Sequence, residues 1–489
     1  MLQKQIQRPP HKMYAFERGW ELTREISGEI MKWTQNSSAQ LSQTQQHIQN
    51  NIAHKNGFVQ MFGYIAIIFL VLCIIALYLL AFLVMLVWVT VHVSMLMALV
   101  SICAILIGLL NVYSWCYAHI IGIRYCCPHS YCYYEMPLPT FICPACFEYH
   151  SFLRPNTYGI FFQRCQCRKK LPTLDILGRK KLERICPACH VPLSEGIGLG
   201  PSIAIPIVGG QSAGKTTYII SAVNAFIQRY QKAPYHYAIS FIDPGSQQLF
   251  EKNVHQLAAG RMLAKTPDIA PQAYMLKITK PETRIPKLLF IYDAAGEVFS
   301  TDSNMSAQLY YKYIHGIIFI IDPCALPAYR RMHQDEIEQV RSSLAPSELD
   351  VDLVYQHLLR IIETYHGVHS TKPHSLPIAV VVTKVDALGL EKEIGSLAVS
   401  DMLSTEQTLF SSSQNGTIHF LVRAFLRKYG LNNLTDELEW RFSSVRYFSC
   451  SAFGRSPDTS ISGGFAPVRV LDPLAWLLEH EGILQTKFR

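Results

Sequence analysis

Residues 209–216 read Gly209-Gly210-Gln211-Ser212-Ala213-Gly214-Lys215-Thr216. This stretch follows the apolar run Ile203–Val208 and precedes a segment that can begin a helix, which is the context that a phosphate-binding loop needs. Its glycines let successive backbone N–H groups converge on phosphate oxygens, and the dipole of the following helix adds positive potential. Lys215 can place a positive charge beside the phosphates, and the hydroxyl of Thr216 can bind Mg²⁺. We therefore predict that residues 209–217, from Gly209 to Thr217, bind a nucleoside triphosphate.

A second apolar run, Leu288–Tyr292, leads into Asp293-Ala294-Ala295-Gly296. A carboxylate at the end of a strand beside a phosphate loop can hold Mg²⁺ through a water molecule. A glycine three residues later lets its backbone N–H approach a γ-phosphate. We expect Asp293 and Gly296 to act in these two ways.

A third apolar run, Ile378–Val382, leads into Thr383-Lys384-Val385-Asp386. A carboxylate at Asp386 can accept hydrogen bonds from the N1–H and the 2-amino group of guanine, neither of which adenine offers. Sites built on such pairs reject the wrong analogue by on the order of 10⁴-fold or more. Lys384 can lay its aliphatic stem over the base. After Tyr447–Cys450, the backbone N–H groups of Ser451 and Ala452 can reach the guanine O6.

In order and spacing, these motifs resemble those of Ras-like P-loop GTPases over residues 203 to about 480. The resemblance implies an α/β domain with a mostly parallel sheet and flanking helices, GTP and Mg²⁺ as ligands, and a switch driven by hydrolysis. It assigns phosphate and metal binding to Gly209, Gly214, Lys215 and Thr216, γ-phosphate sensing to Asp293 and Gly296, and base recognition to Thr383, Lys384, Asp386, Ser451 and Ala452.

The sequence departs from the family pattern at two places. Glu297 stands where many members carry a glutamine that positions water, so intrinsic hydrolysis could be slow or use another residue. The interval from Gly209 to Asp293 is also long, with strands expected near His236–Ile242 and Ala273–Ile278 and a helical insert around Gln247–Leu263. We place the threonine that closes over Mg²⁺ at Thr266, with Thr283 as the alternative. Thr266 could equally be a structural loop residue before Pro267.

From Gly57 to Ile123 the chain contains no Asp, Glu, Lys or Arg. A bilayer core takes about 20 apolar residues per helix, so residues 57–123 predict a transmembrane hairpin with its turn near Thr90–Ser94. A buried pair of core helices is the alternative, but helices of soluble proteins carry a polar stripe. Two crossings and cytosolic GTP would make this a multi-pass protein of the bacterial inner membrane, with its N- and C-terminal regions in the cytoplasm. Lys55 and Arg124 flank the run, as the positive-inside rule expects.

Nine of the 14 cysteines lie between Arg124 and Leu193, in short knuckles that are typical of structural zinc ribbons. Disulfides are disfavoured on a cytosolic face, and a catalytic zinc would keep an open coordination position. Cys126 is a surplus thiol, and His129 could replace one ligand of the first site. Pairing in sequence order predicts two sites: Cys127, Cys132, Cys143 and Cys146 for the first, and Cys165, Cys167, Cys186 and Cys189 for the second.

The formal net charge of +8 is concentrated in two short runs, Arg164–Lys170 and Arg179–Arg184. Such clusters can bind nucleic-acid phosphates or anionic lipid headgroups, or form a solvated face. Because the runs lie close to the apolar segment in sequence, we favour membrane lipid and consider nucleic acid an unlikely partner. The segment before the apolar run is polar, and its Gln/Asn/Ser-rich part, Thr34–Asn56, predicts either a helical stalk or a disordered spacer.

The predicted organisation is a polar N-terminal segment (1–56), a transmembrane hairpin (57–123), a zinc-ribbon module (124–194) and a Ras-like domain (200–489). Over about residues 125–480 the chain resembles bacterial membrane-linked proteins of the double-GTPase type. The likeness rests on Cys165-Gln166-Cys167, Leu171-Pro172-Thr173, Gly178-Arg179, Cys186-Pro187-Ala188-Cys189 and the motifs given above. One GTPase motif set is present, so a partner domain would be a second copy in a homodimer, or another chain.

Three functions follow as hypotheses. In the first, a GTPase switch recruits an unknown effector protein at the membrane, in a bacterial sensing or conflict system. In the second, the chain is a membrane scaffold or adaptor that holds nucleotide with little turnover. In the third, a dimerising GTPase remodels membranes.

Overall fold

A computed structural model of the 489-residue chain gives the architecture. It divides into one unit of Met1–Tyr117 with Thr140–Leu182, and a second of Ala118–Pro139 with Glu183–Arg489. The cysteine block at 124–194 is thus shared between the two units. The structure describes residues 13, 17–52, 57–129, 132–194, 196–261, 263, 272–283, 285–293, 305–339, 346–347, 349–367, 373–405, 414–454 and 465–484.

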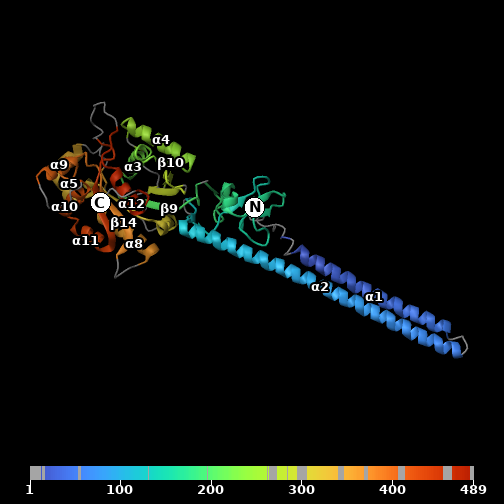
Figure 1. Cartoon of the computed structure of the whole chain (residues 1–489). Helices are drawn as coiled ribbons and strands as arrows, with labels where there is room; N and C mark the ends of the chain where they lie inside the picture. Colours follow the sequence, from blue (N-terminus) through green and yellow to red (C-terminus); the bar gives the residue numbers. More distant parts are fainter. Residues whose placement is uncertain are drawn as a thin grey trace. The chain divides into compact units, whose positions relative to one another are not determined.

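A seven-stranded sheet forms the centre of the second unit, in the order β10-β11-β12-β9-β13-β14-β15 (Figure 1). Strands β12, β9, β13, β14 and β15 run parallel, whereas β11 is antiparallel to both of its neighbours. The sheet is therefore mixed but mostly parallel. Its strands are β9 (Ser202–Gly209), β10 (Ala238–Phe241), β11 (Gln272–Thr279), β12 (Lys287–Asp293), β13 (Ile317–Ile321), β14 (His374–Val382) and β15 (Phe442–Ser449).

Apolar side chains on both faces of the sheet explain why its strands read as continuous hydrophobic runs. Along β9, Ile203, Ile205 and Ile207 pack into one core, which includes side chains of α3 (Lys215–Tyr230) and α12 (Leu471–His480). Ala204 and Val208 point to the other core, which includes α8 (Val351–His366), α10 (Gln414–Lys428) and α11 (Asn432–Arg441). The expected helical insert is α4 (Pro244–Ala258), capped by Asp243. The remaining helices of this unit are α5 (Pro327–Met332), α6 (Gln334–Gln339) and α9 (Ser396–Thr405).

The apolar segment of the chain forms one uninterrupted helix of 65 residues, α2 (Gly57–Ile121). The predicted turn near Thr90–Ser94 is wrong, because these residues are helical and their hydroxyls bond within the helix. Thr90 Oγ1 donates to Val87 O over 2.8 Å, and Ser94 Oγ donates to Thr90 O over 2.7 Å. Residues 57–121 also contain no proline that would break the helix. Among the described helices, one is long and apolar enough to cross a membrane, over Gln60–Ile121. The predicted multi-pass topology, with two crossings and both chain ends on the same side of the membrane, is therefore not supported.

The polar N-terminal segment forms the helix α1 (Arg18–Ile52), which runs beside α2 in Figure 1. The Trp33 and Tyr78 ring centroids lie 5.9 Å apart. The less exposed side chains of α1 recur at three- and four-residue steps, which is the spacing of a helix packed along another helix. The Gln/Asn/Ser-rich residues up to Ile52 are thus a helical stalk and not a spacer. The protected positions are Gly19, Thr23, Ile26, Ile30, Thr34 and Ser37.

Short hairpins carry the cysteine knuckles. In the second unit, β1 (Tyr125–Cys126) pairs with β2 (Glu135–Met136), and β7 (Arg184–Ile185) pairs with β8 (Pro192–Leu193). In the first unit, β3 (Thr140–Ile142) pairs with β4 (Tyr149–His150), and β5 (Phe162–Arg164) pairs with β6 (Lys170–Pro172). Strands of two or three residues are not stable alone, so these hairpins need a further constraint.

The Gly178-Arg179 dipeptide has a structural role in the first unit. Gly178 has φ +104°, a conformation that favours glycine. Arg179 is buried and donates to both carboxylate oxygens of Asp175, and to the carbonyl oxygens of Leu153 and Thr173. These bonds hold the loop together without a ligand.

His419 makes the stability of the second unit depend on pH. Its ring on α10 is half-buried, Nδ1 accepts the Tyr447 N–H over 3.2 Å, and burial lowers its pKa from the ordinary 6.5. The neutral ring therefore stabilises the fold above pH 6.5, and this contribution is lost as pH falls through the folded-state pKa.

We expect His419→Asn, which keeps an acceptor but cannot titrate, to lose less thermal stability between about pH 7 and 5 than the unmodified chain. Thermal unfolding of the full chain in detergent measures this. His255→Asn, at an exposed position on α4, is the matched control. Parallel pH profiles for all three proteins would contradict the assignment.

Candidate nucleotide and metal sites

The phosphate loop joins β9 to α3, as predicted, with Gly209 ending the strand and Lys215 beginning the helix. Close packing explains the first glycine, because a Cβ on Gly209 would lie 2.7 Å from the carbonyl oxygen of Ile320 on β13. Gly214 caps α3 with φ +85°, a left-handed conformation. Gln211 and Thr217, also in this loop, are half-buried. The structure thus requires glycine at position 209 because β13 approaches closely, and favours it at position 214 because the backbone is left-handed.

Lys215 lies folded against its own loop. Its Nζ donates to the carbonyl oxygens of Gly209 (3.0 Å) and Gly210 (2.8 Å), and the residue is 8 % exposed. The ammonium group is thus held at the loop that would surround phosphates. Anionic oxygens are stronger acceptors for it than these carbonyl groups.

The two predicted Mg²⁺ ligands meet. Thr216 Oγ1 donates to Asp293 Oδ2 over 2.7 Å, and Asp293, the last residue of β12, is 1 % exposed. Hydroxyl and carboxylate oxygens are the hard ligands that Mg²⁺ prefers, so this pair fits the metal.

The base-recognition loop after β14 is bonded to the phosphate loop. Lys384 Nζ donates to Ser212 O over 3.1 Å, and Thr383 Oγ1 donates to Ala213 O over 3.1 Å. These bonds join two loops that are 170 residues apart in sequence. The candidate base and phosphate contacts therefore lie at the same edge of the sheet.

Asp386 is oriented by the loop after β15. Ser451 Oγ donates to Asp386 Oδ1 over 2.5 Å and accepts the Gly454 N–H over 2.7 Å. The next residue, Ala452, is tied to α3 because its carbonyl oxygen accepts from Ser221 Oγ over 2.8 Å. Sequence elements predicted separately thus come together around the candidate guanine position.

Comparison with known proteins agrees with this arrangement. Residues 203–450, about half of the chain, match the family model of Double-GTPase 2. The chain belongs to the Double-GTPase 2 family. A relative from Mycolicibacterium smegmatis, named as an ESX-1 scaffolding and assembly protein, SaeC, is 22 % identical over 331 residues, which are 61 % of this chain and 80 % of the relative.

Among solved structures, this Double-GTPase 2 protein matches the Arl6 BBS3 small GTPase from Trypanosoma brucei, determined with the nucleotide analogue GppNp. The identity is 12 %, the match covers 57 % of this chain and 98 % of the other, and the TM-score is 0.26.

Not every predicted site residue of this Double-GTPase 2 protein can be placed. Thr266, Gly296 and Glu297 lie outside the described residues. Thr283 does not suit the alternative role: it is exposed in the turn between β11 and β12. Because β11 is antiparallel to β12, that turn lies at the edge of the sheet opposite to Asp293.

Asp322 makes a contact that the sequence did not reveal. It caps the turn after β13 by accepting the Cys324 N–H over 2.9 Å. Its other oxygen accepts from Lys384 Nζ over 2.7 Å and from the Ser347 N–H over 2.8 Å. The carboxylate is fully buried, so this ion pair fixes the base-recognition lysine. Its position at the end of a strand beside the phosphate loop was the only signal in the sequence.

The cysteines form two clusters, but the predicted pairing in sequence order is wrong. Cys127 and Cys132 group with Cys186 and Cys189 in the second unit, whereas Cys143 and Cys146 group with Cys165 and Cys167 in the first. The knuckles are therefore nested: the outer two pair with each other, and the inner two pair with each other. Sequence order could not show this, because each knuckle supplies two thiols and could share a metal ion with any of the others.

The sulfur positions fit a tetrahedral metal. Within the clusters, Sγ–Sγ distances include 3.6 Å (Cys127–Cys189), 3.8 Å (Cys132–Cys186), 3.7 Å (Cys143–Cys167) and 3.4 Å (Cys146–Cys165). A Zn–S bond of about 2.3 Å places tetrahedral ligands roughly 3.8 Å apart, whereas a disulfide requires about 2.05 Å. Both clusters therefore suit four-coordinate zinc, which would tie hairpins together and leave no open position for catalysis.

The surplus thiol is Cys126, which joins neither cluster. Burial raises its pKa to about 12, so it stays protonated, and its Sγ donates to Tyr133 O over 3.5 Å. His129 also lies outside both clusters. Cys324 and Cys450 are buried, in agreement with a packing role.

A double substitution distinguishes the two pairings. In the nested arrangement Cys127 and Cys189 belong to one site, so Cys127→Ser with Cys189→Ser should remove one zinc of two and leave the other. In sequence-order pairing the same variant would damage both sites. Metal analysis of the purified full chain gives the answer, with Cys126→Ser as the control that retains both ions.

Proposed function

We propose that this protein binds GTP with Mg²⁺ and hydrolyses it as a molecular switch attached to a membrane. The contact that supports guanine recognition best is the Ser451–Asp386 hydrogen bond, which leaves a fixed carboxylate beside Lys384. A carboxylate oriented in this way can accept from the N1–H and 2-amino groups of guanine, but adenine would leave it unpaired.

The phosphate half of the site supports triphosphate binding with a metal ion. Lys215 would exchange its two carbonyl acceptors for phosphate oxygens, and the N-terminus of α3 adds its dipole. Thr216 and Asp293 would hold Mg²⁺, which screens the charge of the phosphates and stabilises the charge that develops during transfer to water. Glu297 would make GTP hydrolysis slow or dependent on a partner protein, because its carboxylate could orient the attacking water but also repels the γ-phosphate.

The relative named for scaffolding favours one alternative, in which the protein is a scaffold that holds nucleotide with little turnover. Both functions need GTP binding, and they differ in phosphate release. In the switch, an effector protein would recognise the GTP-bound form.

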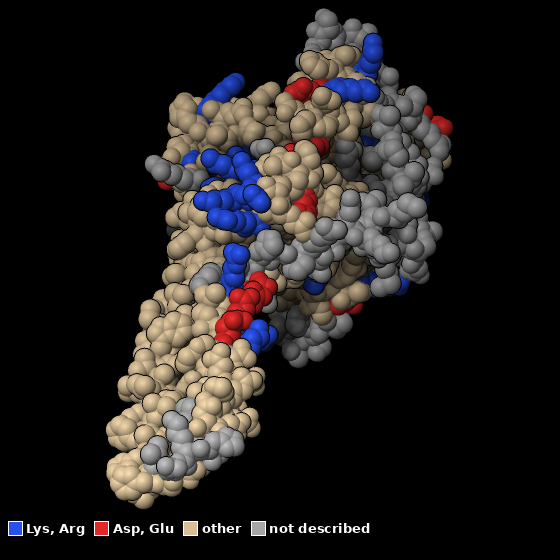
Figure 2. Space-filling view, turned by 90° about the vertical axis from the view of Figure 1, so that its right-hand side faces the viewer, with Lys and Arg blue, Asp and Glu red and all other residues tan. Residues whose placement is uncertain are grey.

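Helix α2 supports membrane attachment. It carries no charged residue, and large apolar side chains are exposed around it, including Phe69 (68 %), Leu77 (66 %), Met95 (69 %) and Ile102 (62 %). On the face seen in Figure 2, the described residues toward the end of the two-helix stalk include no Lys, Arg, Asp or Glu. Exposure of this much apolar surface to water would be strongly unfavourable, so lipid is the medium that suits it.

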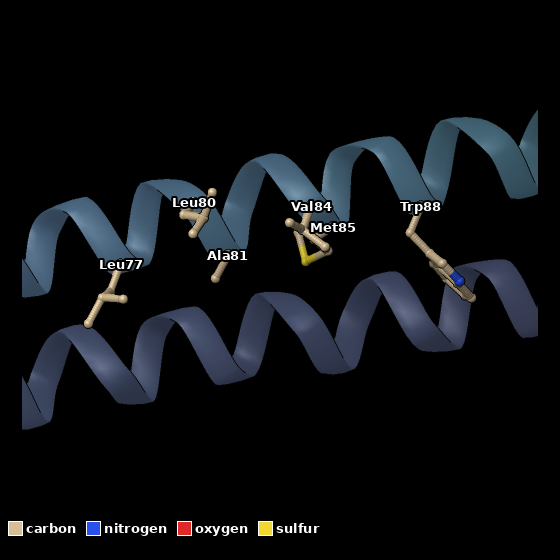
Figure 3. Close-up of a pocket in the computed structure, with 6 residues that line it drawn as sticks. All are labelled: Leu77, Leu80, Ala81, Val84, Met85 and Trp88. Carbon is tan, nitrogen blue, oxygen red and sulfur yellow. The ribbon is translucent and has the colours of Figure 1, made fainter.

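An apolar hollow of about 540 Å³ opens along α2 where α1 runs beside it (Figure 3). Its lining contains no charged group, which suits hydrocarbon chains better than a polar ligand. The residues that line it are Leu77, Leu80, Ala81, Val84, Met85 and Trp88.

We expect the full chain, purified in detergent with zinc, to prefer GTP over ATP by on the order of 10⁴-fold, and Asp386→Asn to reduce that preference. Lys215→Ala should abolish tight binding of either nucleotide. Equilibrium binding and phosphate release measure both properties, with the exposed Asp335→Asn on α6 as the matched carboxylate control. Equal affinity for ATP would refute guanine recognition, and binding without release in the presence of Mg²⁺ would favour the scaffold.

Membrane attachment predicts that the chain stays in the membrane pellet after extraction with alkaline carbonate. Arginine at Phe69, Leu83 and Ile102 together should weaken retention, because the three positions are spread along α2 and whichever part of this stretch crosses the bilayer would carry a charge. A charge at the centre of a bilayer costs about 2.5–3.5 kcal/mol. Arginine at the exposed positions Gln248, Gln334 and Asn433, on helices of the second unit, adds the same charge and should not weaken it. Release of the unmodified chain by carbonate would contradict the proposal.

A further inference from the structure

The cluster of Cys127, Cys132, Cys186 and Cys189 lies near β12, a strand of the candidate nucleotide site, and Tyr133 contacts both. Tyr133 directly follows the cluster residue Cys132 and is only 3 % exposed. Its backbone has φ +41°, which is unusual for a bulky residue and persists only where the surroundings fix it. The ring therefore occupies a position imposed by the fold of the knuckle.

That ring packs against two aromatic side chains of the GTPase sheet region. Its centroid lies 6.1 Å from that of Tyr292, at 70°, and 5.5 Å from that of Tyr310. Tyr292 and Tyr310 stack on each other at 4.5 Å. Burial raises the pKa of both Tyr292 and Tyr310 far above the usual value, so the rings stay neutral and interact by packing.

Tyr292 immediately precedes Asp293, whose carboxylate accepts from Thr216. Rigid packing at Tyr292 therefore limits where the Asp293 carboxylate can lie. Metal and nucleotide sites need their ligands held within about 0.5 Å of the productive geometry.

The knuckle that presents Tyr133 depends on the cluster for its own order. β1 and β2 are two residues long each, and beside their pairing the Cys127 N–H donates to Tyr134 O over 3.0 Å. Two of the cluster's thiols, Cys127 and Cys132, lie in this hairpin loop, and the other two come from the β7–β8 hairpin. A metal bound by all four would join the hairpins, as structural zinc does in small domains.

The second hairpin is bonded to the segment that leads into β9. Arg184 Nη1 donates to Ile197 O over 2.7 Å, a few residues before β9 begins. Gly198 lies so close to Tyr125 of the first hairpin that a Cβ would be 1.9 Å from its ring. Ile197 and Gly198 thus contact one side of the cluster's two hairpins, and Tyr133 extends from the other side.

We propose that the metal site of Cys127, Cys132, Cys186 and Cys189 is a positioning element for nucleotide binding: through Tyr133 it holds Tyr292, and hence Asp293, where Mg²⁺ needs it. The inference rests on the proposed GTP and Mg²⁺ binding. The other cluster, of Cys143, Cys146, Cys165 and Cys167, belongs to the other unit and offers a matched comparison for general effects of zinc loss.

The test uses the full chain in detergent and measures GTP affinity with Mg²⁺ and in EDTA. Cys186→Ser with Cys189→Ser should lower the affinity with Mg²⁺ by about tenfold or more, in line with the loss of groups that orient metal ligands. The affinity in EDTA should change less, because Asp293 acts through the metal. Cys165→Ser with Cys167→Ser should also lose one zinc, yet leave the affinity with Mg²⁺ unchanged.

Loss of zinc could unfold the knuckle altogether, so a second pair of variants leaves the four cysteines in place and changes Tyr133 instead. Tyr133→Leu should keep both zinc ions but show the same selective loss with Mg²⁺, whereas Tyr133→Phe, which keeps the ring, should behave as the unmodified chain. Amide hydrogen exchange over Lys287–Asp293, without nucleotide, should rise in Tyr133→Leu and in the Cys186/Cys189 variant only.

Tyr133→Leu with two zinc ions, unchanged affinity and unchanged exchange over Lys287–Asp293 would overturn the inference. An equal loss of affinity in both cysteine variants would also overturn it. If the unmodified chain binds no GTP, the proposed function fails, and the exchange measurement alone then decides whether the cluster holds β12.

Discussion

The parallel pairing of β12 with β9 is the constraint on which the candidate site depends. Its register sets Asp293 opposite Ile207, two residues before the phosphate loop begins. Because parallel strands end at the same edge, Asp293 reaches Thr216, and the loops after β13, β14 and β15 also lie at this edge. Phosphate, metal and base contacts therefore need no special connection beyond the strand order. An antiparallel β12 would have placed Asp293 at the other end of the sheet.

The two halves of the nucleotide site differ in how far they are already arranged. At the base half, hydrogen bonds and one ion pair link four loops through Asp322, Lys384, Ser212, Asp386 and Ser451. A buried carboxylate such as Asp322 is stable only because it is paired and hydrogen-bonded. At the phosphate half, Lys215 bonds to the loop's own carbonyl groups, so binding of a triphosphate must redirect it. The base half is thus pre-organised, and the phosphate half changes on binding.

Helix α2 imposes a different constraint, on the surroundings of the chain. At 1.5 Å per residue its 65 residues extend roughly 97 Å, whereas a bilayer core is about 30 Å thick. A single upright crossing would use about a third of the helix. The remaining apolar surface needs lipid along its length, or protein, and α1 covers only part of one side.

The sequence by itself determined the small-GTPase-like fold and predicted most of the candidate site, because each motif is local: a strand, its terminal residues and the next turn. Gly209–Thr216, Asp293 and Thr383–Asp386 could be assigned from their flanking apolar runs. The tertiary structure decided what depends on distant parts of the chain. Each of the four knuckles supplies two thiols and could share a metal ion with any other, and only the fold groups Cys127 with Cys189. Thr90–Ser94 is polar enough for a turn, but the helix satisfies its hydroxyls with carbonyl groups of the preceding turn, and no proline interrupts it. Tyr133 and Asp322 have no motif, since their roles arise from contacts with Tyr292 and Lys384, which the chain reaches only after folding.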